Sequence, residues 1–311
     1  MKQIVLIGIG AGAAAALLFA SLGSGSPFAF VLFYLSPLPI LIAGIGWSYV
    51  AGLIAAVFAT ACLALLRDGY LALAFAVTIA LPAWWLGYLA LLARPADGVS
   101  PDKLEWYPAG RLVLWTALIG AAVVAIAIPF FGTDAQSFQD TVKAGIESAL
   151  RGHTDGELNQ DSLYLLVKLA PGLVAWLTAM VLMINIWLAF RIAKVSGQLR
   201  RPWPDLSAIR FPRTAPVWLA AALAGIFLPG LIGIFAVAFA AALTAAFVVL
   251  GFAVLHVLTR GLSARPLVLA GAYTAVIIFA WPLAIIPALL GLADAAFDLR
   301  GRATRGPPTL H

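Results

Sequence analysis

Charged residues are scarce in this chain of 311 residues: Asp, Glu, Lys and Arg together make up 10%, while hydrophobic residues make up 63%. A soluble domain usually carries about a quarter of its residues as charged ones, so a soluble fold is excluded and a membrane protein is indicated. Lys and Arg outnumber Asp and Glu by 19 to 13. In a membrane protein this excess marks cytoplasmic connections, and we predict no nucleic-acid partner.

Cysteine and histidine are also rare, and their scarcity bears on chemistry. Cys62 is the single cysteine, which excludes a disulfide framework and a cysteine-based metal site. The histidines are scattered, and neither an HExxH motif nor a GxxxxGK[ST] phosphate loop is present. Carboxylates are missing from the interior of the apolar runs, which argues against a paired-aspartate protease. We therefore expect no catalytic residues, no metal site, no cofactor and no enzyme activity.

What the sequence does contain is a series of apolar runs. A helix needs about 20 mostly apolar residues to cross the hydrocarbon layer, because its backbone polar groups must be paired within the segment. Nine runs qualify or nearly qualify: 3–22, 28–46, 47–66, 69–93, 111–131, 163–190, 215–230, 231–259 and 266–291. We predict an all-α polytopic transmembrane helix bundle with about 8–9 spans, in which residues 1–311 form a single integral membrane domain.

Positive charge sets the predicted orientation. A cytoplasmic N-terminus puts most Lys and Arg residues inside, including the basic loop 191–213. The acidic connection 132–161 then lies outside, and the apolar spacing within 134–150 predicts a short amphipathic helix. Nine crossings would place the arginine-rich tail outside, against the rule. Because Pro282 and Pro287 interrupt the last run, an alternative with eight crossings and both ends inside stays open.

Proline, tryptophan and polar residues inside the runs mark a candidate ligand cavity. Two prolines close together withdraw backbone donors, and broken helices at membrane depth face protein or a water-filled cavity. Polar groups in hydrocarbon are functional candidates because each costs free energy. The predicted ligand-binding residues are Pro37, Pro39, Trp84, Trp85, Lys168 and Asn185. Each has an alternative role: a structural kink for the prolines, an interfacial aromatic belt for the tryptophans, snorkelling for Lys168 and an amide bridge between helices for Asn185.

Small residues recur every four positions along the first run. Such a stripe allows a second helix to approach closely in lipid. We predict that Gly8, Gly12, Ala16 and Ala20 dock a partner subunit, with internal packing as the alternative.

Motifs along almost the whole chain resemble the YybS-like family of bacterial membrane proteins, domain of unknown function 2232. The matching pieces are Pro37 to Pro39 with Gly44, Trp47 and Gly52, then Leu81-Pro82 through Gly87-Tyr88, Asn185 with the basic segment after it, and Leu290 to Asp294 with Phe297 to Arg300. The N-terminal half of that family is similar to the substrate-binding subunits of energy-coupling-factor vitamin transporters. In those subunits a small-residue motif on the first helix contacts a membrane coupling protein, and separate ATPases supply energy. The resemblance would assign Gly8, Gly12, Ala16 and Ala20 to that contact, although those subunits usually have fewer helices.

These inferences lead to one functional expectation and one alternative. We expect a transporter-like small-molecule-binding unit without its own ATPase, embedded as a multi-pass protein in the bacterial inner (plasma) membrane. Its partners would be the lipid bilayer and a coupling membrane protein with ATPases. The alternative is a non-transporting scaffold that organises envelope or division proteins through the first-run stripe and the 191–213 loop.

Overall fold

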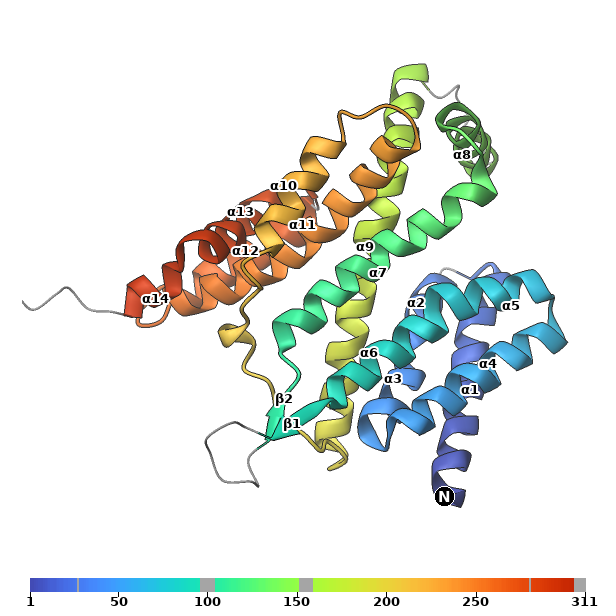
Figure 1. Ribbon diagram of the computed structural model, residues 1–311, viewed down its shortest axis with the longest axis horizontal. Coiled ribbons are helices and arrows are strands. Elements are labelled where there is room, and N and C mark those ends of the chain that lie inside the picture. Colours follow the sequence, from blue (N-terminus) through green and yellow to red (C-terminus); the bar gives the residue numbers. More distant parts are fainter. Residues whose placement is uncertain (27, 96–103, 151–158, 280, 305–311) are drawn as a thin grey trace, which may run out of the picture. The chain divides into compact units, whose positions relative to one another are not determined.

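The computed structural model of the chain describes residues 1–26, 28–95, 104–150, 159–279 and 281–304. These residues are almost entirely helical, apart from connections and one antiparallel pair of short strands, β1 (Ala93–Pro95) and β2 (Leu104–Trp106) (Figure 1). The chain divides into two compact units, Met1–Thr116 with Met180–Pro204, and Ala117–Ala179 with Asp205–His311. Helices α7 (Ala109–Phe131) and α9 (Gln160–Val195) each contribute residues to both units.

Seven helical segments in the described part are long and apolar enough to cross a membrane, which confirms an all-α membrane helix bundle. They are Lys2–Gly23, Ala29–Gly46, Tyr49–Leu66, Gly69–Leu91, Ala109–Phe131, Gln160–Val195 and Leu231–Leu258. They coincide with the first six predicted runs and the eighth. Large apolar side chains such as Leu6 and Phe227 are exposed on the surface, as expected of helices that face lipid tails.

The first unit is built from closely packed helices rich in alanine and glycine. Its elements are α1 (Lys2–Ala20), η1 (Ser21–Ser24), α2 (Ala29–Tyr34), α3 (Pro37–Gly46), α4 (Tyr49–Leu66), α5 (Gly69–Phe75), the π turn η2 (Ala76–Ala80) and α6 (Leu81–Leu91). Helix α1 packs along α4, and α3 packs against both α4 and α6. Polar side chains cap two of the starts: Ser48 Oγ accepts from Ala51 N–H, and Asp68 Oδ1 accepts from Leu71 N–H.

Two of the spans in this unit are interrupted at prolines. Leu35 and Ser36 separate α2 from α3, which begins at Pro37. In the fourth span, the π turn η2 stands between α5 and the Leu81-Pro82 start of α6. Proline has no N–H to donate and its ring clashes with the preceding turn, so the helix either breaks or widens there. Since α3 contacts both α6 and η2, the two interrupted spans are neighbours.

The second unit contains the remaining helices and the C-terminal parts of the chain. Its elements besides α7 and α9 are α8 (Ala135–Leu150), η3 (Leu206–Ala208), α10 (Ala215–Gly225), α11 (Leu231–Leu258), α12 (Arg265–Phe279), α13 (Trp281–Phe297) and α14 (Leu299–Thr304). Helix α11 packs against α10 and, most extensively, against α13 (Figure 1). Gly251 and Gly291 permit the close approach to α13, because a Cβ added at Gly251 would overlap the Pro287 carbonyl oxygen.

The α8 helix has one apolar and one polar face. Phe138 is buried, and its ring centroid lies 5.9 Å from that of Phe131 at the end of α7. Gln139 and Asp140 are exposed on the other side. Within the acidic connection 132–161, residues 151–158 lie outside the described part of the chain, as does the tail beyond residue 304.

Two of the nine predicted spans differ from the sequence prediction. The seventh run contains α10, whose 11 residues reach only about 16 Å, and it is preceded by non-helical chain from residue 209 to 214. The ninth run is two helices, α12 and α13. The prolines explain the second difference, because they remove helical hydrogen bonds.

Helices α12 and α13 form a helical hairpin rather than one continuous helix. Arg260, just after α11, donates from Nη2 to Ser207 Oγ at 2.6 Å, and Arg300, just after α13, donates from Nη1 to Ser207 O at 2.7 Å. The C-terminal ends of α11 and α13 therefore meet at one residue, so these two helices run in the same direction. Helix α12, which connects them in sequence, runs in the opposite direction, and the chain returns to the end where α11 finished.

Candidate ligand site at a broken helix

The break between α2 and α3 leaves one backbone carbonyl without its helical donor. Leu38 N–H, the usual partner of the Tyr34 carbonyl, instead donates to Leu35 O at 3.0 Å. In a regular helix, residue 37 would donate to the Phe33 carbonyl, but Pro37 has no N–H. Ser36 N–H donates to Phe33 O instead, at 3.0 Å. The two prolines thus shift the local hydrogen bonds by one residue and release the Tyr34 carbonyl.

Asn185 from α9 supplies the missing donor. Its side chain is 1% exposed, and Nδ2 donates to Tyr34 O and to Val181 O, each at 2.8 Å. This amide therefore joins α9 to the break, which is the bridging role that the sequence left as an alternative to ligand binding. Both N–H groups of the amide are used by protein.

Two buried oxygens at the same break are left without a hydrogen-bond partner among the described residues. One is Asn185 Oδ1, and the other is the hydroxyl of Ser36, a residue that is 0% exposed. Buried polar groups are nearly always hydrogen-bonded, because leaving one unsatisfied costs about 1–3 kcal/mol. The arrangement can therefore accept hydrogen bonds from a small polar group that enters the break.

An aromatic cluster lies on α6, the helix next to α3. The Trp84 and Tyr88 rings stack with centroids 6.3 Å apart, and the Trp85 ring meets that of Trp115 edge-on at 5.4 Å. The Nε1 atoms of Trp84 and Trp85 are buried and have no acceptor within the described part of the chain. Helices α3 and α6 approach closely at Gly44 and Gly87, which places the cluster on a neighbour of the broken helix.

The structure brings some of the predicted ligand-binding residues together. Pro37 and Pro39 lie in the first turn of α3, directly after the break to which Asn185 is bonded, and Trp84 and Trp85 belong to the same unit. Lys168 lies in the other unit, where its side chain is exposed. Its role as a ligand residue stays a prediction, and an exposed lysine near a helix end fits the snorkelling alternative.

The stripe predicted to dock a partner is occupied within the first unit. A Cβ added at Gly12 would lie 2.6 Å from Ala55 O, and one added at Gly8 would lie 2.7 Å from Ile54 Cβ. Ala16 is also buried, whereas Ala20 is half-buried. Packing of α1 against α4 therefore accounts for Gly8 and Gly12, and docking of a partner subunit by the four residues stays a prediction.

Sequence reasoning overlooked several functional candidates in this structure. Ser36 was not singled out, although a hydroxyl directly before the first of two prolines in an apolar run is a detectable signal. Arg201 was counted as an orienting charge, but it is buried at 8% exposure. Asp294 and Arg300 were noted only as a motif, and they form a buried ion pair at 2.7 Å.

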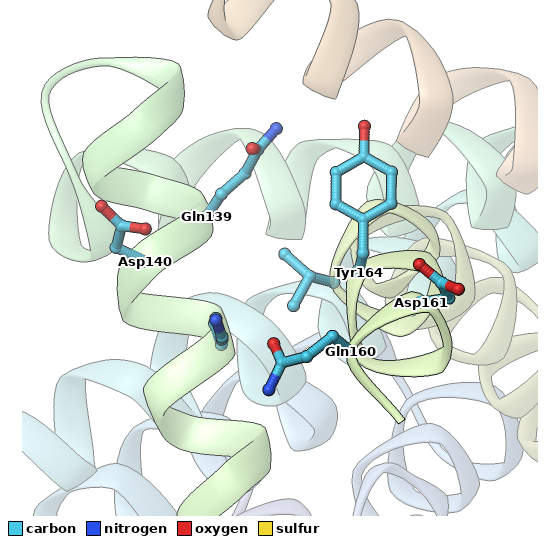
Figure 2. A pocket seen from close by; sticks show the side chains of 7 residues that line it. Gln139, Asp140, Gln160, Asp161 and Tyr164 are labelled. Atoms are coloured by element: carbon cyan, nitrogen blue, oxygen red, sulfur yellow. The ribbon is translucent and has the colours of Figure 1, made fainter. Parts of the chain in front are cut away.

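A cavity of about 380 Å³ lies between α8 and the start of α9 (Figure 2). It is lined by Gln139, Asp140, Lys143, Gln160, Asp161, Tyr164 and Val167. Apart from Lys143 and Val167, these side chains are exposed, so solvent satisfies their polar groups and a ligand is not required. Among the described residues, no three side chains of His, Cys, Asp or Glu lie close enough together to hold a metal ion.

The architecture defines the class to which the protein belongs: it is a polytopic all-α membrane protein with proline-broken spans. A family model described as predicted membrane protein, DUF2232, matches residues 13–295, so the chain belongs to that family. The family expected from the sequence motifs is thereby confirmed. Comparisons with curated proteins and with solved structures each found no match.

Proposed function

We propose that the protein is a membrane-embedded unit that binds a small molecule at the α2–α3 break. The observation that carries the proposal is the pair of buried oxygens, Ser36 Oγ and Asn185 Oδ1, without protein partners among the described residues. Transporters place their ligand sites at such discontinuous helices. The unit would have no catalytic activity and no ATPase of its own, and a coupling membrane protein with ATPases would supply energy, as the family resemblance implies.

The chemistry of the break indicates what kind of ligand it takes. Asn185 Oδ1 only accepts, so the ligand has to donate at least one hydrogen bond through an N–H or O–H group, while the Ser36 hydroxyl can accept or donate a second one. The hydrogen bonds described at the break join Asn185 to the backbone of Tyr34 and Val181, and these groups offer no counter-charge to a charged ligand. We therefore propose a neutral polar ligand, for which the α6 aromatic cluster would offer ring faces.

The test is purification of the tagged protein from its native membrane in mild detergent, followed by mass spectrometry of retained small molecules and proteins. We expect a stoichiometric small molecule on the wild type and at least a roughly tenfold loss in Ser36→Ala, which corresponds to one lost hydrogen bond in a dry site. The matched control is Thr60→Ala on α4, whose hydroxyl is bonded within its own helix to Ala56 O at 2.8 Å. Retention of lipid alone together with envelope or division proteins would contradict the proposal and favour the scaffold alternative.

We also propose that the protein lies in the inner membrane with both ends in the cytoplasm. Counting 205–225 as one crossing gives eight, because α12 and α13 return the chain to the end of α11. This topology removes the conflict between the arginine-rich tail and the positive-inside rule. The test is labelling of Cys62→Ala variants in intact cells with an impermeant maleimide. Gln136→Cys should react while Lys2→Cys and Arg302→Cys should not, and labelling of Arg302→Cys would contradict the proposed topology.

A further inference from the structure

Arg201 is a buried cation in the first unit. It follows α9, its residue is 8% exposed, and Nη1 donates to Ala90 O at 2.9 Å. The guanidinium carbon lies 5.8 Å from the ring centroid of Trp106 and 5.5 Å from that of Phe190. Its Nε is buried without a partner among the described residues.

The charge of Arg201 is not neutralised by any carboxylate in the described part of the chain. The ion pairs found there join Arg94 to Glu105, Arg210 to Asp298 and Arg300 to Asp294. Burial lowers the pKa of Arg201, but an arginine stays protonated at neutral pH. A buried charge without a counter-charge is strongly unfavourable, so an anion from outside the chain is expected nearby.

A pocket lies next to Arg201, because Trp106, whose ring Arg201 contacts, is one of its lining residues. Its volume is about 460 Å³, and its lining includes Trp106, Tyr107, Arg94, Arg111 and Glu105. Arg94 is paired with Glu105 at 2.8 Å, but both side chains are more than half exposed, and such a surface pair is weak enough to rearrange. Arg111 is exposed at the start of α7.

The position of the pocket indicates where the anion comes from. Two candidate membrane spans meet it, one ending at Leu91 and the other beginning at Ala109. The ends of spans lie at the level of lipid headgroups, where Trp and Tyr are enriched and basic residues bind anionic lipids.

We propose that this pocket binds a phosphate-type anion. Arg111 and Arg94 contact the phosphate oxygens with charge-assisted hydrogen bonds, and Arg201 stabilises the anion as a buried positive charge next to Trp106. The preferred source is the phosphodiester of an anionic lipid headgroup, and free phosphate is the other source of the same chemistry. This site shares no residue with the α2–α3 break, so its test does not depend on the proposed function.

The test compares lipid binding to delipidated full-length protein by native mass spectrometry, with phosphatidylglycerol and phosphatidylcholine as probes. We expect phosphatidylglycerol to be preferred, and both Arg111→Gln and Arg201→Gln to weaken its binding about tenfold, as expected for one lost charge-assisted contact. The control is Arg67→Gln, which removes an exposed positive charge from the same unit and should change binding by less than about twofold. If Arg201→Gln does not fold, Arg201→Lys, which keeps the charge, should retain phosphatidylglycerol binding while Arg111→Gln loses it.

A competition experiment distinguishes the two sources. Displacement of phosphatidylglycerol by millimolar inorganic phosphate supports a site for the phosphate group itself, whereas displacement by phosphatidic acid alone supports a lipid headgroup. Equal binding of phosphatidylglycerol and phosphatidylcholine would overturn the proposal. An equal loss in Arg67→Gln and Arg111→Gln would also overturn it, because the binding would then be non-specific attraction to net charge.

Discussion

Backbone carbonyls at the ends of helical segments are satisfied by a distant side chain in both units, but by different chemistry. At the α2–α3 break in the first unit, the neutral amide of Asn185 caps the Tyr34 carbonyl at 2.8 Å. In the second unit, the charged guanidinium of Arg300 caps the carbonyls of Ser207 and Ile209 at 2.7 and 2.6 Å. Lipid-exposed backbone groups cannot remain unpaired, so both interruptions need such a partner.

The two interruptions differ in whether all of their buried polar atoms have a hydrogen-bond partner. Every guanidinium nitrogen of Arg300 donates to a protein oxygen, and Asp294 neutralises its charge through Oδ2 while Oδ1 accepts from Arg300 N–H. At the break, by contrast, Ser36 Oγ and Asn185 Oδ1 remain without partners among the described residues. A closed network, in which every polar atom has a partner, makes the structure rigid. An open network, in which some polar atoms lack a partner, can bind a ligand through those atoms. This difference is why the break, and not the ion pair, is the candidate site.

The largest expected loss of stability comes from breaking the buried Asp294–Arg300 ion pair. Asp294→Asn leaves the Arg300 charge buried without a counter-charge, and removing one member of a buried pair costs about 3–5 kcal/mol. The control is Arg210→Gln, which breaks the exposed pair with Asp298 and should cost less than about 1 kcal/mol. Thermal unfolding in detergent measures both. Similar losses in the two variants would show that the Asp294–Arg300 pair is no more structural than a surface pair.

The contribution of helix packing to the second unit can be separated from that of charge. Gly251→Ala places a Cβ against the Pro287 carbonyl, and overpacking of this kind costs about 1–3 kcal/mol. The control is Gly10→Ala, where nothing lies within 4 Å of the added Cβ. That change should be neutral or slightly stabilising, because alanine favours a helix over glycine. A wild-type unfolding temperature for Gly251→Ala would mean that α11 and α13 do not pack as closely as described.

At the open interruption, losing the amide should cost less than losing the charge pair. Asn185→Leu replaces the amide with an apolar side chain of similar size. The Tyr34 carbonyl then has no donor, which costs about 1–3 kcal/mol. Thr116→Val is a suitable control, because its hydroxyl only donates to Val113 O within the same helix, at 2.7 Å. If Asn185→Leu unfolds at the wild-type temperature, the amide does not hold the break, and the contrast between the two interruptions fails.

Local sequence chemistry predicted the spans and the position of the break, but not the partners. Apolar composition identifies seven long spans, and Pro37 and Pro39 identify the break, because both signals depend on neighbouring residues. The bond from Asn185 to Tyr34 joins residues 151 positions apart, and that of Arg300 to Ile209 joins residues 91 positions apart. Such pairings depend on tertiary packing, which no local pattern encodes. The sequence left eight crossings open only as an alternative and did not predict the hairpin of α12 and α13, since two prolines permit either a kink or a reversal.

The smallest expected effect on stability is the most informative about the site. Ser36→Ala removes a buried hydroxyl that has no partner among the described residues, so no hydrogen bond is lost and the free energy of unfolding should fall by no more than about 0.5 kcal/mol. If that hydroxyl serves a ligand, the same variant should lose the retained small molecule. Asn185→Leu should lose both stability and ligand, because its amide serves the backbone as well. A large loss of stability in Ser36→Ala would instead place its hydroxyl in a structural contact, and the break would then be as closed as the Asp294–Arg300 network.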